Sequence, residues 1–289
     1  MKTAGIIGLG LLGGSVAKAL RQKCGFEKIV AYNRTQSNLD QALSEKIIDA
    51  GTNKIDENFA DCDIVFVCST VDLIAAHLAE VSKFIKNNCI LTDVGSTKKD
   101  IVKNFSHKNF IAGHPMAGTE KNGYSASFAG LFEGAVWVLT PTEESDPAYL
   151  GELEALIKKM GAVPAVIDYR LHDDLVAVVS HMPHIVAYSL VHLLVTKTLE
   201  NQELNALYNN FFGGGFKDTT RIASSLPSLW TSIIMNNREN LIKLIGEYQK
   251  EMESLSDILG RADSEALTAY FEESKKYRDN VYEHKKETL

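Results

Sequence analysis

Residues 3–15 read Thr-Ala-Gly-Ile-Ile-Gly-Leu-Gly-Leu-Leu-Gly-Gly-Ser, an apolar run that passes directly into glycines. In a strand–turn–helix unit of this kind, Gly8 allows the tight turn, Gly10 lets a diphosphate approach the backbone, and Gly13 lets helix and strand pack closely. Free N–H groups at the start of the helix attract phosphates. A purely structural turn is the competing interpretation. We favour a dinucleotide site and assign to it Gly8, Leu9, Gly10, Leu11, Leu12 and Gly13.

The rest of the first half repeats this alternation of strand and helix. Continuous apolar runs, typical of parallel strands covered on both faces, predict strands at 3–8, 29–32, 64–68, 90–93 and 110–113. Helical patterns lie between them at 13–23, 37–45, 72–85 and 98–105, and further elements are predicted at 135–140 (strand), 148–160 (helix) and 163–167 (strand). Repeated units of this kind predict an α/β fold with a doubly wound Rossmann sheet.

The second half shows helical patterns only, at residues 170–200, 227–259 and 264–284. We therefore predict a dinucleotide-binding Rossmann domain over residues 1–167 and an all-helical substrate and dimerisation domain over residues 168–289. A long apolar helix cannot stand in water alone, so we expect other helices to cover it, including those of a second subunit in a homodimer.

Composition narrows the partners and the compartment. The net charge is −7 without a basic block, which argues against nucleic acid. The four cysteines (Cys24, Cys62, Cys68 and Cys89) fit neither a zinc site nor a disulfide framework. We expect that the start of the chain leaves no room for a signal peptide and that no apolar stretch reaches the ~18–20 residues of a membrane span. We therefore expect a cytoplasmic protein without a membrane partner.

The end of the second predicted strand bears on the choice of cofactor. NAD-binding proteins usually carry an acid there, but this chain has Asn33, followed by Arg34 and Thr35. A guanidinium beside hydroxyl groups suits the 2′-phosphate of NADP, whereas Asn33 with a solvent-exposed Arg34 would suit NAD. We predict NADP or NAD, with NADP slightly favoured. Ser69, which follows the strand predicted at 64–68, and Asp93, which ends the strand predicted at 90–93, are assigned to the same cofactor site.

His114 is the candidate base. It follows the predicted strand 110–113, on the sheet edge where open α/β folds bind ligands, and small residues surround it. Its ordinary pKa near 6.5 suits proton transfer at neutral pH. The competing interpretation is a structural histidine. Ser96 lies on a second loop at the same edge.

Two clusters in the helical half also carry polar groups. Asp173, Ser180, His181 and His184 share one stripe of a predicted α-helix, and Pro183 should kink that helix. The stripe favours a ligand site, with an internal hydrogen-bond network as the alternative; a metal is disfavoured, because HxxH lacks a well-placed acid. Beyond three glycines at 213–215, Arg221 is a candidate carboxylate clamp, unless it pairs with Asp218 at the surface.

Together the motifs at residues 8–15, 92–98, 113–123, 180–184 and 213–230 resemble the prephenate and arogenate dehydrogenases of tyrosine biosynthesis. The resemblance implies oxidative decarboxylation of prephenate to 4-hydroxyphenylpyruvate. It implies that His114 takes the proton of the substrate hydroxyl, that Ser96 supports that hydroxyl, and that Arg221 binds a carboxylate. By the same resemblance the substrate pocket includes His184, His181, Thr119, Glu120 and Asp173.

Several alternatives stay open. The sequence does not separate prephenate from arogenate. A β-hydroxyacid dehydrogenase or imine reductase shares the same general plan, and a catalytically silent NADP-binding sensor is a reading from another class. Asn33-Arg34 departs from the acidic strand end of NAD-specific relatives, and we expect no additional regulatory domain beyond the two described. Any feedback by tyrosine would therefore act at the active site.

Overall fold

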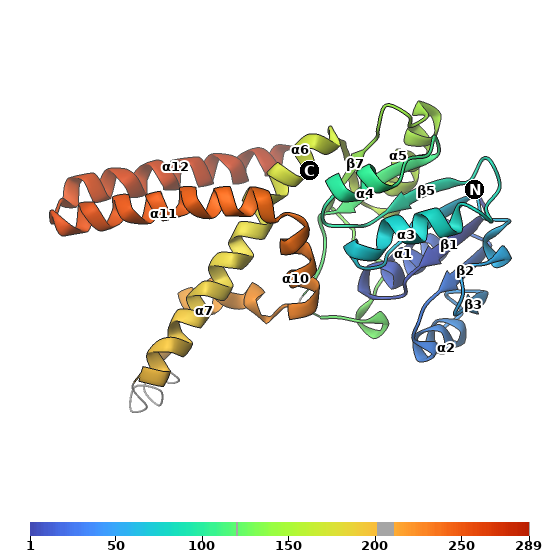
Figure 1. Ribbon diagram of the computed structural model, residues 1–289, viewed down its shortest axis with the longest axis horizontal. Coiled ribbons are helices and arrows are strands. Elements are labelled where there is room, and N and C mark those ends of the chain that lie inside the picture. Colours follow the sequence, from blue (N-terminus) through green and yellow to red (C-terminus); the bar gives the residue numbers. More distant parts are fainter. Residues whose placement is uncertain (120, 201–210, 289) are drawn as a thin grey trace. The chain divides into compact units, whose positions relative to one another are not determined.

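The computed structural model describes residues 1–119, 121–200 and 211–288. The chain divides into two compact units, residues 1–238 and 239–289, and each is described by itself. The first unit holds the sheet and several helices, and the second is a pair of long helices (Figure 1).

A single eight-stranded sheet in the order β3-β2-β1-β4-β5-β6-β7-β8 forms the centre of the first unit. Every neighbouring pair is parallel except β6 and β7, which are antiparallel. The predicted doubly wound sheet is therefore confirmed. The strands are β1 (Thr3–Ile7), β2 (Lys28–Tyr32), β3 (Ala50–Thr52), β4 (Ile64–Val67), β5 (Ile90–Asp93), β6 (Phe110–Pro115), β7 (Val136–Thr140) and β8 (Val163–Val166).

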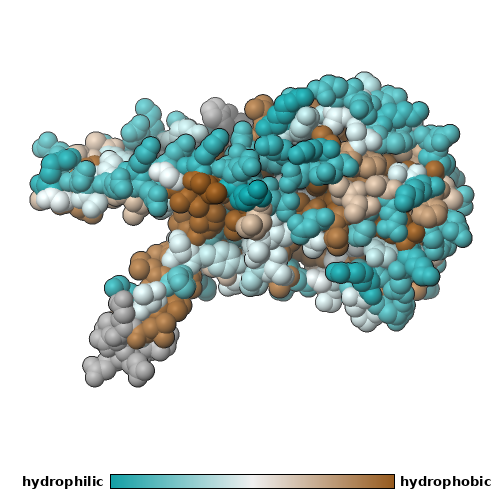
Figure 2. Space-filling model, viewed as in Figure 1, coloured by the Kyte–Doolittle hydropathy of each residue, from teal (hydrophilic) through white to brown (hydrophobic). Residues whose placement is uncertain are grey.

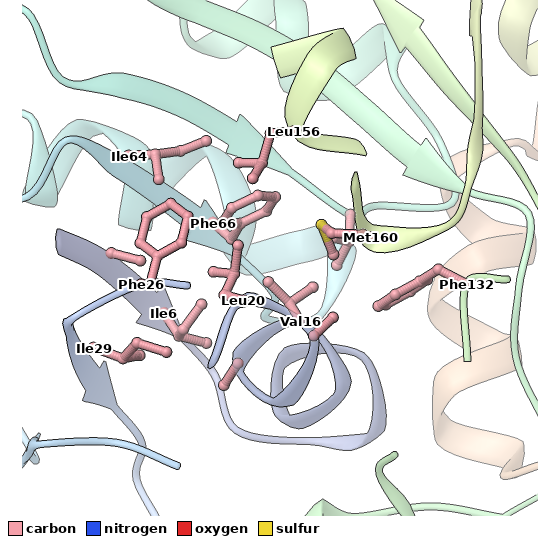
Figure 3. Packing of buried hydrophobic residues seen from close by; sticks show 14 of the residues in the cluster. Ile6, Val16, Leu20, Phe26, Ile29, Ile64, Phe66, Phe132, Leu156 and Met160 are labelled. Carbon is pink, nitrogen blue, oxygen red and sulfur yellow. The ribbon is translucent and has the colours of Figure 1, made fainter. Parts of the chain in front are cut away.

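Helices cover both faces of this sheet, because alternate residues of each strand point to opposite sides. On one face Ile6 and Phe66 pack with α1 and α5, and Figure 3 shows Val16, Leu20 and Leu156 converging there. On the other face Ile7, Val65 and Val67 pack against α3 and α4. The helices are α1 (Leu11–Gln22), α2 (Gln36–Ser44), α3 (Val71–Val81), α4 (Lys99–Asn104) and α5 (Pro147–Met160).

The chain after β8 is helical throughout the described residues. In the first unit these helices are α6 (Tyr169–Val176), a π-helical segment (Ala177–His181), α7 (Met182–Glu200), α9 (Gly214–Thr220) and α10 (Pro227–Asn236). Hydrogen bonds tie α10 to the sheet domain, since Ser232 Oγ and Asn236 Nδ2 both donate to the Asp72 carboxylate at the start of α3. The second unit contains α11 (Arg238–Gly260) and α12 (Ser264–Thr288).

The structure differs from the sequence predictions at several places. The strand β3 was not predicted, because Ala-Gly-Thr is too short and too weakly apolar to give a strand pattern. The helix predicted over residues 227–259 is broken at Asn237. The helix predicted over residues 170–200 contains the π-helical segment, so the predicted stripe, which assumed a continuous α-helix, is wrong in its phase.

The helical run Tyr169–Leu199 also corrects the statement on apolar stretches. It is long and apolar enough to span a membrane by length and composition, with only 17% of the most apolar window buried. Counting unbroken apolar residues missed it, because Ser180, His181 and Pro183 interrupt the run without lowering its mean hydropathy far. Leu171, Val178 and Val179 on it are more than half exposed, and Figure 2 shows apolar colour along α7. Such an exposed apolar surface is typical of a face that packs against another molecule.

Candidate functional site

The glycine-rich turn has the geometry that its sequence predicts. Gly8 adopts φ +101°, in the region that favours glycine. A Cβ on Gly13 would lie 1.9 Å from the carbonyl oxygen of Gly8, so only glycine lets α1 begin so close to β1. A Cβ on Gly10 would meet nothing within 4 Å, which leaves open space beside the backbone at the start of α1. A diphosphate fits that space.

Asn33 braces this turn from the end of β2. Its side-chain oxygen accepts a hydrogen bond from the N–H of Leu9 at 3.1 Å, and its Nδ2 donates to the carbonyl of Thr35 at 3.1 Å. Asn38 on α2 donates to the carbonyl of Leu9. Arg34 and Thr35 follow with exposed side chains, which leaves both accessible to a ligand.

A small aromatic and polar group lines the next strand end. Ser69, half-buried after β4, lies 3.0 Å from Nδ1 of His77 on α3. The ring of His77 meets Tyr32 edge to face at 5.6 Å. Burial lowers the pKa of His77, and the nearby Arg34 lowers it further. Ser69 and Arg34 therefore lie around the same histidine.

His114 lies near the end of β6 and is 7% exposed. Its Nδ1 is 2.9 Å from Nε2 of His172 on α6, and the two rings meet at 61°. His172 is fully buried and was not predicted as a site residue. Its other ring nitrogen, Nδ1, lies 2.7 Å from Oδ1 of Asp173. Three side chains thus form a hydrogen-bonded line that ends at His114.

Asp173 is buried and engaged on both carboxylate oxygens. Besides His172, it accepts hydrogen bonds from the N–H of Lys98 at 2.7 Å and of Lys99 at 3.0 Å. The structure shows Asp173, which the sequence motif assigns to the substrate pocket, in a network of internal hydrogen bonds. Asp173 joins α6 to the start of α4 and anchors His172.

Asp93 and Lys98 form a fully buried ion pair beside this line. The ammonium of Lys98 also donates to the carbonyl of Gly113 at 2.6 Å, while Oδ1 of Asp93 accepts from the N–H of Gly113 at 3.1 Å. The pair thus holds both backbone groups of the residue before His114. Asp93, which is predicted to bind the cofactor, makes these positioning contacts in the structure.

His181 and His184 gather around Trp230. His184 stacks on Trp230 with ring centroids 3.3 Å apart, and His181 meets the same ring edge-on at 6.0 Å. His181 Nδ1 faces the Asn237 side chain at 3.1 Å, and Asn237 also donates to the carbonyl of Asp173 at 2.7 Å. Among the described residues, His181 Nε2 is buried without a hydrogen-bond partner.

Burial keeps these histidines neutral near pH 7. Burial, followed by the nearby His172, Lys98 and His181, holds the pKa of His114 well below its usual 6.5. Burial also lowers the pKa of His172, and it lowers that of His181 to about 4. For Asp173 burial alone would raise the pKa, but hydrogen bonds from His172 and two backbone N–H groups bring it below its usual value. A neutral His114 is a competent base.

The other predicted residues lie around this core. Ser96 is half-buried in the loop after β5, and Thr119 is exposed in the loop after β6. Arg221 is exposed after α9 and lies near enough to His184 to lower its pKa, although burial is the larger cause. Glu120 lies outside the described residues. Within the part of the chain that the structure describes, no cluster of three His, Cys, Asp or Glu side chains suits a metal ion.

Comparison with known proteins identifies the family. Residues 16–166 match the family model of the prephenate dehydrogenase nucleotide-binding domain, and residues 168–273 match that of the prephenate dehydrogenase dimerization domain. The chain belongs to the prephenate dehydrogenase family. The resemblance found in the sequence motifs is thereby confirmed.

Individual members of the prephenate dehydrogenase family match over almost the whole chain. Prephenate dehydrogenase of Bacillus subtilis is 33% identical over 282 residues, which are 96% of this chain and 75% of that protein. The solved structure of the Aquifex aeolicus enzyme with hydroxyphenyl propionate and NAD+ has TM-score 0.90 and 35% identity, covering 97% and 98% of the two chains. Synechocystis arogenate dehydrogenase has TM-score 0.82 and 28% identity, covering 96% and 99%.

In this family member, sequence reasoning missed several residues that build the site. Lys98 ends the motif at residues 92–98, but a lysine at the start of a predicted helix is ordinarily exposed to solvent. His172 was passed over because adjacent residues on a helix do not share a face. The position of His172 directly before Asp173 could have indicated a contact between the two side chains. Trp230 and Asn237 required the fold, since they reach the site from α10 and its end.

Proposed function

We propose that this protein converts prephenate and NAD(P)+ to 4-hydroxyphenylpyruvate, carbon dioxide and NAD(P)H. The observation that carries the proposal is His114, a neutral, hydrogen-bonded histidine at the sheet edge that carries the glycine-rich turn. Its position at the carboxyl end of a parallel strand is where open α/β sheets bind ligands. The family membership supports the same reaction.

His114 serves as the base in this reaction. It accepts the proton of the hydroxyl group on the ring as that carbon is oxidised, and it returns the proton to the same oxygen as the ring becomes aromatic. When bound, the nicotinamide supplies the oxidising power by accepting a hydride. The ring carboxylate leaves as carbon dioxide, so no net proton is consumed. The protein contributes orientation and one well-placed base.

The substrate is a dianion, so the site also needs a cation and an aromatic surface. Arg221, near His184, binds the carboxylate that stays on the product, because a guanidinium forms paired hydrogen bonds to a carboxylate. His184 stacked on Trp230 offers a flat face for the ring. Ser96 supports the reacting hydroxyl. The sequence motif also assigns Thr119, Glu120 and His181 to the substrate pocket.

The cofactor is held by the turn at Gly8–Gly13, with NADP+ favoured over NAD+. The open space at Gly10 fits the diphosphate, and Ser69 lies at the next strand end. Since Asn33 uses its side-chain oxygen on the turn, Arg34 and Thr35 are the groups left for a 2′-phosphate. Affinity titrations should give at least a threefold advantage to NADP+, and Arg34→Ala should abolish it. A tenfold preference for NAD+ would refute this preference.

Four assays test the reaction: prephenate and arogenate, each with NAD+ and NADP+. We expect reduced cofactor and carbon dioxide in equal amounts with prephenate. Arogenate dehydrogenase is the alternative, and a higher kcat/KM with arogenate would establish it. His114→Asn should lose most of the turnover and keep cofactor binding. Turnover of a β-hydroxyacid without carbon dioxide release would favour a β-hydroxyacid dehydrogenase. No turnover at all would favour a catalytically silent NADP-binding sensor.

We also propose that the protein is a cytoplasmic homodimer whose residues 168–289 form the dimerisation domain and residues 1–167 the cofactor domain. The exposed apolar side chains on Tyr169–Leu199 support a second copy as the cover, because large exposed apolar patches mark interfaces. The dimerization-domain match over residues 168–273 supports the same partner.

A further inference from the structure

We propose that His172 acts with His114 as a two-histidine proton relay, in which His172 selects the tautomer of His114 and takes over its positive charge beside Asp173. The inference rests on the proposed function, since it concerns the base of that reaction. In this relay His172 and Asp173 are positioning residues, and His114 alone meets the substrate.

The three side chains are connected in one line. His114 Nδ1 and His172 Nε2 are 2.9 Å apart, and His172 Nδ1 and Asp173 Oδ1 are 2.7 Å apart. All three residues are buried: His172 is 0%, Asp173 3% and His114 7% exposed. Both ring nitrogens of His172 are thus used inside the protein.

Donor and acceptor chemistry fixes the direction of every hydrogen bond in this line. An ionised carboxylate only accepts, so His172 must donate to Asp173 from Nδ1. Neutral His172 then presents a lone pair at Nε2, which can only accept from Nδ1–H of His114. His114 is left with a bare Nε2. The base nitrogen is therefore the one that faces away from the relay.

The Asp93–Lys98 pair keeps this line in place. The N–H of Lys98 donates to Asp173, while its ammonium donates to the carbonyl of Gly113, the residue before His114. The contacts close a ring that runs from His114 through His172, Asp173 and Lys98 back to Gly113. A side chain held at both ends in this way keeps one orientation, as a positioned base requires.

The proton path follows from this arrangement. As the substrate O–H bond breaks, its proton bonds to Nε2 of His114, and the proton on Nδ1 passes to Nε2 of His172. The positive charge then lies on His172, next to the Asp173 carboxylate. When the ring oxygen takes its proton back, both transfers reverse, so atoms and charge balance over the cycle.

The surroundings explain why the charge would move. Burial and the neighbours His172, Lys98 and His181 disfavour a proton on His114. His172 is also buried near Lys98, but it faces the carboxylates of Asp173 and, further off, Asp93, which favour a proton there. A positive charge therefore has a better place on His172 than on His114.

Two variants of His172 separate the two tasks. The amide of His172→Gln can reach toward His114 and accept its Nδ1–H, but it cannot carry a proton. The shorter amide of His172→Asn can reach Asp173 but not His114. With prephenate we expect kcat to fall about tenfold for Gln and about 100-fold for Asn, with KM within threefold. His107→Gln, a histidine outside the site, is the matched control and should keep wild-type kcat.

The pH profile distinguishes a relay from a structural contact. If the two histidines share the proton beside Asp173, losing His172 moves the acid limb of kcat/KM to lower pH. If His172 is only a neighbouring group that repels charge on His114, its loss moves that limb to higher pH. Movement to higher pH, or none, overturns the relay. Thermal unfolding and cofactor titration by fluorescence show that each variant is folded.

A measurement without turnover tests the tautomer. In wild-type protein labelled with 15N-histidine, long-range 1H–15N correlation should show His114 protonated at Nδ1 and bare at Nε2, and His172→Asn should lose this preference. The opposite wild-type tautomer would overturn the relay and leave the proposed function standing. The expected tautomer without turnover of prephenate or arogenate would overturn the proposed function and leave the tautomer assignment standing.

Discussion

At the residue scale, two glycines three positions apart serve different purposes. Gly13 is required by the fold, because a Cβ there would lie 1.9 Å from a backbone oxygen. Gly10 has open space around its Cα and backbone that any residue can adopt, with φ −96°. Its lack of a side chain therefore has no packing role inside the folded protein, which agrees with the diphosphate position proposed beside it.

Replacing each glycine by alanine separates the two roles. Gly13→Ala should lower the free energy of unfolding by about 2 kcal/mol, because the clash must be relieved by backbone movement. Gly10→Ala should leave that energy within ~0.5 kcal/mol and weaken dinucleotide binding at least tenfold. Urea unfolding and fluorescence titration measure the two quantities. Equal effects of both substitutions on stability would contradict this assignment.

At the element scale, the side-chain amide of Asn237 makes hydrogen bonds at the break between α10 and α11. Asn237 is 4% exposed and separates two helices that the sequence pattern predicted as one, over residues 227–259. Its Nδ2 reaches both the carbonyl of Asp173 and Nδ1 of His181. The end of α10 is thus tied to α6 and to the π-helical segment.

Asn237→Leu tests this connection, since leucine has a similar size without hydrogen-bonding groups. We expect the free energy of unfolding to fall by about 2–3 kcal/mol, because two buried acceptors lose their donor. Asn236→Leu, at the neighbouring half-buried position, loses its hydrogen bond to the Asp72 carboxylate and should cost less, about 1 kcal/mol. Thermal unfolding of the pair measures the difference. Similar losses for both variants would show that the Asn237 amide has no special role.

Some features of these elements could be predicted from the sequence, and others could not. Continuous apolar runs in the sequence predicted most of the strands, and the roles of Gly8 and Gly13 in the turn were predicted from the glycine spacing. His114 was predicted as the base from its position after a strand. Lys98, His172 and Asn237 were missed, because a buried polar residue is recognised by its partners, and those partners lie on other elements. The π-helical segment was missed because its residues follow an ordinary helical pattern.

At the scale of the whole molecule, buried neutral histidines link stability to pH. The folded protein holds the pKa of His181 at about 4 and those of His114 and His172 below the 6.5 of an unfolded chain. Below pH 6.5 the unfolded chain therefore binds more protons than the folded protein. The associated stability is complete above pH 6.5 and is lost as the pH falls toward 4.

For His181 alone the loss is on the order of 3 kcal/mol between pH 6.5 and 4, because each pKa unit corresponds to about 1.4 kcal/mol. Urea unfolding at pH values from 7.5 to 4.5 should show the free energy of unfolding falling steadily below pH 6.5. His181→Asn should flatten the curve, and His192→Asn, an exposed control, should not. A wild-type curve that is flat between pH 6.5 and 5 would falsify this prediction.

The apolar surface of Tyr169–Leu199 is tested by breaking it. Val179 and Leu193 are 57% and 56% exposed, so glutamate at either position costs little within one chain. In the proposed homodimer the charge would be buried against a second copy. Sedimentation should therefore show a dimer for the wild type and monomer for Val179→Glu with Leu193→Glu. Lys54→Glu, on the sheet domain, should remain dimeric, and a dimer from the double variant would move the interface elsewhere.

The π-helical segment Ala177–His181 also constrains how this family member can change its length. A wide turn holds more residues than an α-helical one, so it has the effect of an insertion inside the helix. Deleting one residue there would let the chain close into an ordinary α-helical turn, so His184 would keep nearly the same direction relative to Asp173. Deleting a residue between Asp173 and this segment would instead rotate His181 and His184 by about 100°. Among related chains, the π-helical segment is therefore free to lose its extra residue, whereas α6 should keep its length.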